Sequence, residues 1–296
     1  MIEPTISRDD ANRSITDRVP PLAFFLVSAV SHYLGPGLAV LLFGAIPPLG
    51  VGLLRIAAAA VVFAGWRQPW RRLNGWSARE RLDAVLLGVT LAAMNLVFYL
   101  AIARLPLATV GAIEFLGPVA LAAAGLRSRR NFVAFALAMA GVALLTKVRI
   151  GGDPIAFVFA FANAALFVLY VLLGHRIAGS GGMRGTDRLA GAMLIAFVAA
   201  LPVGLMDALP ALRDPVLLAA AFGVGVLSSV IPYVCDQFAM ARLPRASFAL
   251  LLALLPAMAA AIGVLLLHQV PSHGELTGIA LVMAGVALHR SGARPA

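Results

Sequence analysis

The feature that most constrains this sequence is a series of long apolar stretches, which recurs from residue 21 to residue 289. Most of these stretches reach the roughly 17 to 25 residues that a helix needs to cross about 30 Å of hydrocarbon. Of the 296 residues, 61% are apolar and only 12% are charged, a composition that is not typical of a water-exposed globular protein. The sequence therefore predicts an all-α membrane protein that crosses the bilayer many times.

Apolar runs bounded by charged residues, glycine or proline predict ten transmembrane helices. The first five are expected at 21–44, 48–66, 82–103, 106–126 and 131–147. The second five are expected at 154–174, 188–209, 215–241, 244–267 and 274–289. Residues 1–19 alternate acidic and basic side chains without the apolar core of a signal peptide, so we expect a polar tail there. Residues 290–296, after the last expected helix, are expected to form a second tail.

The distribution of basic residues indicates how these helices are oriented. The net charge is +10, but the arginines form short clusters between apolar runs and not an aromatic-interleaved surface, which argues against a nucleic-acid partner. Of the 23 lysines and arginines, 18 fall on the side of both tails, four fall on the opposite side, and Arg55 lies within a helix. The positive-inside rule then predicts a multi-pass inner-membrane protein with both termini in the cytoplasm.

The chain also repeats itself. The segment AIARLPLATVGAIEFLGPVALAA from Ala101 resembles AMARLPRASFALLLALLPAMAAA from Ala239, and ALAMAGVALL from Ala136 matches ALVMAGVALH from Ala280 at eight of ten positions. Each repeat, 20–147 and 154–289, contains five expected helices, so the second copy enters the membrane in the opposite sense. Inverted repeats of this kind underlie alternating access around a site near the bilayer midplane.

Several of these segments resemble a known family. NLVFYLAIARLPLATVGAIEFLGPVA, PYVCDQFAMARLP and PPLGVGLLRIAAAA are similar to EamA-type drug/metabolite transporters, in particular to their threonine/homoserine exporter branch. The resemblance implies ten helices in two EamA repeats, cytoplasmic termini, a central cavity, and export of small amphiphilic metabolites that are often amino acids.

The resemblance also carries over a set of positions to this chain. They are Arg55, Asn95, Tyr99, Glu114, Pro118, Tyr170, Tyr233 and Asp236. Two departures from the family pattern stand out in the second repeat. Leu255 replaces the acidic residue that commonly precedes the ninth-helix proline, and His268-Gln269 replaces a frequent Gly-Glu.

Three ionisable residues lie within apolar helices, where a charge costs about 2.5 to 3.5 kcal/mol on insertion scales. Glu114 is expected to receive a substrate ammonium or a coupling proton, or else to be a protonated side chain bonded to a helix carbonyl. Asp236 is either a second functional carboxylate or a structural partner of Arg55 or of a helix-end carbonyl. Arg55 either holds a substrate carboxylate, forms a structural pair, or snorkels to the interface.

Two polar faces are related by the repeat. Asn95 and Tyr99 lie one turn apart on the third helix, and Tyr233 and Gln237 occupy the matching positions of the eighth. These residues are expected either to line a cavity or to form interhelical hydrogen bonds. Glycine and proline mark expected helix breaks or gating points at Gly35, Pro36, Pro118 and Pro256.

The pattern favours a secondary transporter over other classes of protein. No Walker motif is present, and the single cysteine excludes a cysteine metal site within one chain, so no metal, cofactor or catalytic residue is expected. A membrane enzyme would need clustered acid, base or metal-binding groups, whereas Glu114 and Asp236 are isolated in sequence. Exporters of another amphiphilic metabolite or drug, and a non-transporting membrane subunit, are the alternatives.

Overall fold

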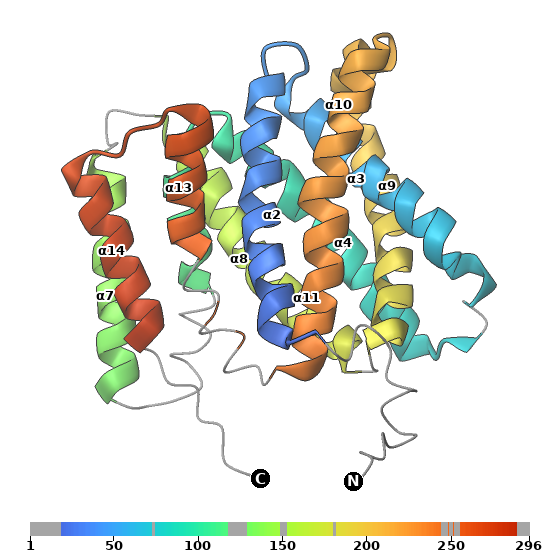
Figure 1. Ribbon diagram of the computed structural model, residues 1–296, viewed down its shortest axis with the longest axis horizontal. Helices are drawn as coiled ribbons and strands as arrows, with labels where there is room; N and C mark the ends of the chain where they lie inside the picture. The colour runs from blue at the N-terminus through green and yellow to red at the C-terminus, as the bar shows by residue number, and fades with distance from the viewer. Residues whose placement is uncertain are drawn as a thin grey trace, which may run out of the picture.

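The computed structural model describes residues 19–72, 75–117, 129–148, 153–179, 182–243, 248, 251 and 255–288. Within these ranges the chain consists of helices and the loops between them (Figure 1). The first part contains α2 (Pro21–Leu42), α3 (Pro48–Arg67), η2 (Pro69–Arg71), α4 (Ala78–Ile102), α5 (Leu107–Glu114) and α7 (Arg129–Val148). The second part contains α8 (Pro154–Ala178), α9 (Gly182–Leu212), α10 (Pro215–Gly225), η4 (Val226–Val230), α11 (Ile231–Arg242), α13 (Leu255–Leu267) and α14 (His273–Leu288).

Helix starts follow local signals in the sequence. Asp153 and Asp214 cap α8 and α10 by accepting a hydrogen bond from a backbone N–H of the first turn, and proline follows each of them. Ser77 and Glu80 form a capping box at the start of α4, so this helix begins four residues before the expected 82. Proline likewise occupies the first position of α2 and α3, without a side-chain cap, and the observed starts of α2, α3, α8, α10 and α14 lie within one residue of the expected ones.

The helices are apolar on their outer surface as well as inside. Large exposed side chains include Leu41, Val158, Val198 and Leu265, which are 58%, 64%, 66% and 76% exposed. Six helical stretches are long and apolar enough to cross a membrane, at Pro21–Leu42, Pro48–Arg67, Ala78–Ile102, Pro154–Ala178, Arg184–Leu212 and Pro215–Arg242. The expected all-helical membrane protein is thus confirmed, while ten crossings remain a prediction. Of the fourth and ninth expected helices, 118–126, 244–247, 249–250 and 252–254 lie outside the described residues.

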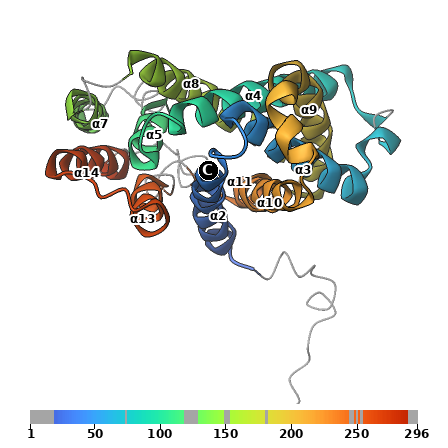
Figure 2. The same cartoon turned by 90° about the horizontal axis from the view of Figure 1, so that it is seen from above.

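Helix packing follows a regular plan. Viewed along the bundle, α7 and α14 lie side by side at one end and α3 packs with α9 near the other (Figure 2). Between these pairs, α5 packs against α13, α4 against α8, and α2 against α11. The first helix of each part therefore packs against the third helix of the other, where α4 is the third helix of the first part and α10, η4 and α11 together form the third helix of the second.

The prediction of a helix break at Gly35 and Pro36 is wrong, because α2 is α-helical from Pro21 to Leu42 with Pro36 inside it. A side chain on Gly35 would place its Cβ 2.2 Å from Ser228 Cβ, so this glycine serves close packing against η4. The irregular backbone lies instead on that partner segment, where the expected eighth helix is interrupted by the π-helical turn Val226–Val230.

Acidic and basic side chains join the helix ends at the pole where α2 begins. Asp187 of α9 is 4% exposed, and it pairs with Arg67 at 2.5 Å and with Arg72. Arg188 pairs with Glu80, and Arg176 lies 3.8 Å from Asp83. These pairs tie the ends of α3, α4, α8 and α9 together.

The loop after α13 supports the start of α5. Gln269 Oε1 accepts a hydrogen bond from the Leu107 N–H at 3.1 Å, which satisfies a donor in the first turn of α5. The preceding His268 has φ of 53°, a left-handed conformation that glycine adopts without steric cost. The His268-Gln269 pair thus supplies a hydrogen bond to α5 and places a non-glycine residue at a left-handed position.

We predict that Asp187→Asn lowers the thermal stability of the detergent-solubilised protein by about 2 kcal/mol, because it leaves the largely buried Arg67 without a full counter-charge. Thermal unfolding followed by circular dichroism measures this effect. Arg176→Gln is the control, since the exposed pair with Asp83 contributes about 1 kcal/mol or less. Equal effects of the two substitutions would contradict the role assigned to Asp187.

We also predict that His268→Gly raises thermal stability by about 0.5 to 1 kcal/mol, because glycine relieves the left-handed strain at a small entropic cost. The same unfolding assay tests this change. His273→Gly, at the first residue of α14, serves as the comparison and should lower stability, since glycine is a poor helix former. A destabilising His268→Gly would show that His268 makes a contact that outweighs the strain.

Candidate functional site

Glu114 lies at the end of α5 and is 2% exposed. The Tyr33 hydroxyl of α2 donates to Oε2 at 2.9 Å, and the Asn163 amide of α8 donates to Oε1 at 3.0 Å. Both carboxylate oxygens therefore accept hydrogen bonds from side chains of other helices and not from the backbone of its own helix. Buried polar groups are usually satisfied in this way, because an unpaired one costs about 1 to 3 kcal/mol.

Asp236 of α11 is held by the same two helices. The Ser28 hydroxyl of α2 donates to Oδ1 at 2.5 Å, and the Tyr170 hydroxyl of α8 donates to Oδ2 at 2.6 Å. Its hydrogen-bond partners are thus two hydroxyls and not the expected Arg55. Each of the two buried carboxylates receives one donor from α2 and one from α8.

Arg55 is buried near the middle of α3, with 3% of its surface exposed. Nε donates to Ser229 Oγ at 2.7 Å, and Nη2 donates to the Ser228 carbonyl at 2.5 Å. The guanidinium carbon lies 5.6 Å from the centre of the Tyr99 ring, a distance suited to a cation–π contact. Arg55 therefore does not snorkel to the interface but is anchored to η4.

Arg55 and Glu114 line one small cavity whose lining residues are all buried. Its volume is about 10 Å³, which is room for about one water molecule. The walls come from six helices and include several polar side chains; they are formed by His32, Arg55, Met94, Asn95, Phe98, Glu114, Asn163 and Tyr233. A cationic and an acidic side chain thus face the same small buried cavity.

A second cavity of about 10 Å³ lies beside Asp236. It is lined by Phe25, Ser28, His32, Phe167, Tyr170, Asp236, Phe248 and Leu255. His32 forms part of the wall of both cavities. Leu255 also lines this second cavity, so an apolar side chain lies near Asp236 at the position where the family resemblance implied an acidic residue.

The two carboxylates lie at different depths along α2. Ser28, which contacts Asp236, precedes Tyr33, which contacts Glu114, by five residues or about 7.5 Å of helix. Further along, Val40 lines an open pocket of about 460 Å³ at the end of the bundle where α2 finishes. Arg104, Thr109, Gln269 and Glu275 also line this pocket, which we call the outer vestibule.

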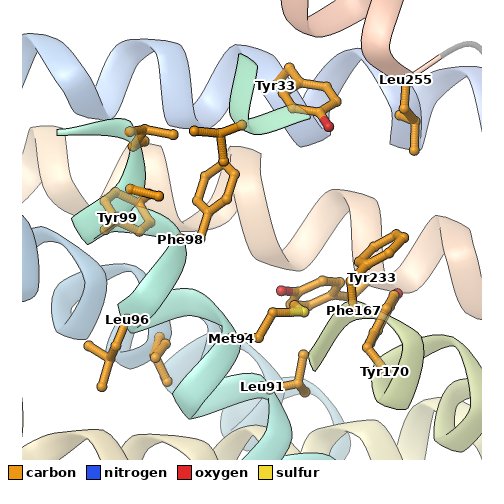
Figure 3. Close-up of a cluster of buried hydrophobic side chains, with 14 of the residues drawn as sticks. Tyr33, Leu91, Met94, Leu96, Phe98, Tyr99, Phe167, Tyr170, Tyr233 and Leu255 are labelled. Carbon is orange, nitrogen blue, oxygen red and sulfur yellow. The ribbon is translucent and has the colours of Figure 1, made fainter. Parts of the chain in front are cut away.

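The two polar faces predicted from the repeat meet at one point. Asn95 Nδ2 donates to the Tyr233 hydroxyl at 3.2 Å and to the Leu91 carbonyl at 2.7 Å. Tyr233 also packs against Tyr170, with ring centres 5.5 Å apart, and Figure 3 shows both rings beside Met94 and Phe167. Interhelical hydrogen bonding and cavity lining therefore both apply to Asn95 and Tyr233.

The other two members of these faces lie outside both small cavities. The Tyr99 hydroxyl and the side-chain amide of Gln237 are buried, with no hydrogen-bond partner among the described residues. Gln237 is directed toward the glycines of α8 and α9, since a Cβ on Gly185 would lie 3.0 Å from its Oε1.

Of the two prolines expected to mark helix breaks, Pro118 lies outside the described residues, and Pro256 is the second residue of α13.

Sequence reasoning missed the residues that satisfy the buried charges. Asn163 is a single amide within an apolar helix, a signal that could have marked it, whereas Ser28, Ser228 and Ser229 are common residue types in such helices. Among the described residues, no group of three or more His, Cys, Asp or Glu side chains is placed to hold a metal ion.

Comparisons with known proteins identify a matching family and several similar proteins. The sequence profile of the EamA-like transporter family matches residues 152–290. The threonine/homoserine exporter RhtA of Escherichia coli (strain K12) is 30% identical over 270 residues, which is 89% of this chain and 89% of the relative. The protein of that name from Salmonella typhimurium (strain SL1344) is 31% identical over 268 residues, covering 88% and 86%.

A known crystal structure shares the fold. It superposes with a TM-score of 0.56 at 22% sequence identity, and the match covers 90% of this chain and 96% of the other. Identity to the exporters over nearly the whole length, together with the profile match in the second part, establishes the family. The chain belongs to the EamA-like transporter family.

Proposed function

We propose that this protein exports a small zwitterionic amino acid, such as threonine or homoserine, from the cytoplasm by alternating access. The relatives that it matches along most of its length are named as exporters of these two amino acids. The observation that carries the proposal is the small buried cavity that Arg55 and Glu114 share, because a free amino acid has both a carboxylate and an ammonium group.

In this proposal the substrate lies between the two charges. The planar guanidinium of Arg55 binds the carboxylate, and Glu114 binds the ammonium. Asn95, Asn163 and Tyr233 offer hydrogen-bonding groups to a hydroxyl on the substrate side chain. A cavity of about 10 Å³ is too small for an amino acid, so binding requires its walls to separate.

The proposed topology is ten transmembrane helices in two inverted five-helix repeats, 20–147 and 154–289. Three observations support it. The packing of α2 on α11 is mirrored by that of α8 on α4, and α3, α5 and α7 pack against α9, α13 and α14. Asn95 and Tyr233, which bond to each other, are 138 residues apart, the same offset that separates Pro106 from Pro244 in the sequence repeat.

The proposed orientation places tails 1–19 and 290–296 in the cytoplasm of a cell with an inner membrane. The helix ends at the pole where α2 begins carry Arg67, Arg72, Arg176 and Arg188, in agreement with the positive-inside rule. The same pole receives the end of α14 (Figure 1). The outer vestibule then opens to the opposite side, and its volume of about 460 Å³ is suitable for a departing amino acid.

Asp236 is proposed to carry the coupling proton. It lies nearer the cytoplasmic pole than Glu114, the described residues that line its cavity include no lysine or arginine, and both of its oxygens are held by hydroxyls. Hydroxyls can donate to the carboxylate and accept from the carboxylic acid, so they tolerate both protonation states. Intramembrane carboxylates in transporters commonly form such proton relays.

We predict that Glu114→Gln lowers the rate of net export of labelled threonine from proteoliposomes by about 100-fold or more. The reason is that the neutral amide gives up the charge-assisted bond to the substrate ammonium. Glu80→Gln is the matched control. Glutamine preserves the capping box at the start of α4 and gives up only the charge of the pair with Arg188, which lies away from both small cavities, so export should stay within about twofold of the wild type.

Export by Glu114→Gln at the wild-type rate would contradict the binding role of Glu114. Loss of export in both variants would instead indicate a general fault in folding or reconstitution. Circular dichroism and gel filtration of each purified variant separate the two cases.

A further inference from the structure

The helix that contains Asp236 departs from α-helical geometry at Val226–Val230, which ends six residues before Asp236. In η4 the Ile231 N–H bonds to the Val226 carbonyl, five residues earlier, as in a π-helix. Pro232 follows immediately and has no N–H. In a regular α-helix the N–H of residue 232 would bond to the carbonyl of Ser228, so proline leaves that carbonyl without its α-helical donor.

Arg55 supplies the missing donor from another helix. Its Nη2 donates to the Ser228 carbonyl at 2.5 Å, while Nε donates to Ser229 Oγ at 2.7 Å. A guanidinium has five N–H donors, and these two bonds employ two of them. The remaining donors belong to a group that lines the cavity shared with Glu114.

Close backbone contacts hold η4 against its neighbours on two sides. A Cβ on Gly35 of α2 would lie 2.8 Å from Ser228 Cα, and one on Gly225 would lie 2.9 Å from the Arg55 carbonyl. Neither position has space for a side chain without movement of the backbone. The Ser228 carbonyl is therefore presented to α3 at a defined position.

We propose that Pro232 is a positioning residue, which acts through Arg55 to place the guanidinium for the substrate carboxylate. This inference rests on the proposed function and identifies the residue that orients the Arg55 guanidinium of the proposed substrate site. By withholding one backbone donor, Pro232 keeps the Ser228 carbonyl available to Nη2. The neutral acceptors Ser228 and Ser229 fix the plane of the guanidinium and leave its positive charge for the ligand. Irregular π-helical turns are frequent at functional sites for this kind of reason.

The test is Pro232→Ala, which restores the N–H that competes with Arg55 for the Ser228 carbonyl. Equilibrium binding of labelled threonine to the purified protein is measured, with threoninol, which lacks the carboxylate, as a competitor. We expect the Kd for threonine to rise about tenfold, and that for threoninol to change by less than about twofold. Pro202→Ala is the control, since Pro202 is an exposed proline inside α9, and it should leave both values unchanged.

A double-mutant cycle with Arg55→Lys tests whether Pro232 acts through Arg55. The effect of Pro232→Ala should disappear in the Arg55→Lys background, so that the two changes are strongly non-additive. Additive effects, or equal weakening of threonine and threoninol, would overturn the proposal in favour of a general packing role.

Ser229 provides a second arm that does not depend on the proline variant folding. Ser229→Ala removes the acceptor for Nε and should also weaken threonine selectively, whereas Ser229→Thr retains a hydroxyl and should restore binding. Unchanged threonine binding in Ser229→Ala and Pro232→Ala would overturn the positioning role while the proposed function stands. Failure of the wild-type protein to bind threonine would overturn the proposed substrate, and the positioning role toward its carboxylate with it.

Discussion

The structure depends on the cost of burying ionisable groups among apolar helices. Water is absent from the hydrocarbon region, so each charged side chain must find its hydrogen bonds within the protein. Glu114 and Asp236 meet this requirement in the same way, each with one donor from α2 and one from α8. Arg55 meets it with neutral acceptors in η4.

These bonds join the first part of the chain to the second. Glu114 takes Tyr33 from its own part and Asn163 from the other, whereas Asp236 takes Tyr170 from its own part and Ser28 from the other. The groups proposed to bind the substrate and the proton are thus the same groups that hold the two parts together. A ligand that replaces one of these bonds loosens the contact between the parts, which is how binding can be coupled to movement in alternating access.

Much of the architecture could be predicted from the sequence. Long apolar runs bounded by charged residues, glycine or proline located most of the helices, and charges within apolar helices pointed to Glu114, Asp236 and Arg55. Their partners could not be predicted, because Ser28, Asn163 and Ser229 come from distant segments whose positions depend on tertiary packing.

The irregular backbone was assigned to the wrong helix: Gly35-Pro36 suggested a break in α2, whereas Ile231-Pro232 borders the π-helical turn. Gln237 matched the repeat pattern but is directed toward α8 and α9, since side-chain direction depends on the local backbone as well as on spacing.

The central claim is that a substrate carboxylate binds Arg55 in the buried cavity that Arg55 shares with Glu114 and not in the outer vestibule. Solid-state NMR can test it directly, by measuring dipolar coupling between carboxyl-¹³C threonine and ¹⁵N-labelled arginine side chains in the reconstituted protein. The account predicts a strong coupling that is lost in Arg55→Lys and retained in Arg104→Lys. A coupling that survives Arg55→Lys and disappears in Arg104→Lys would place the substrate in the outer vestibule and contradict the account.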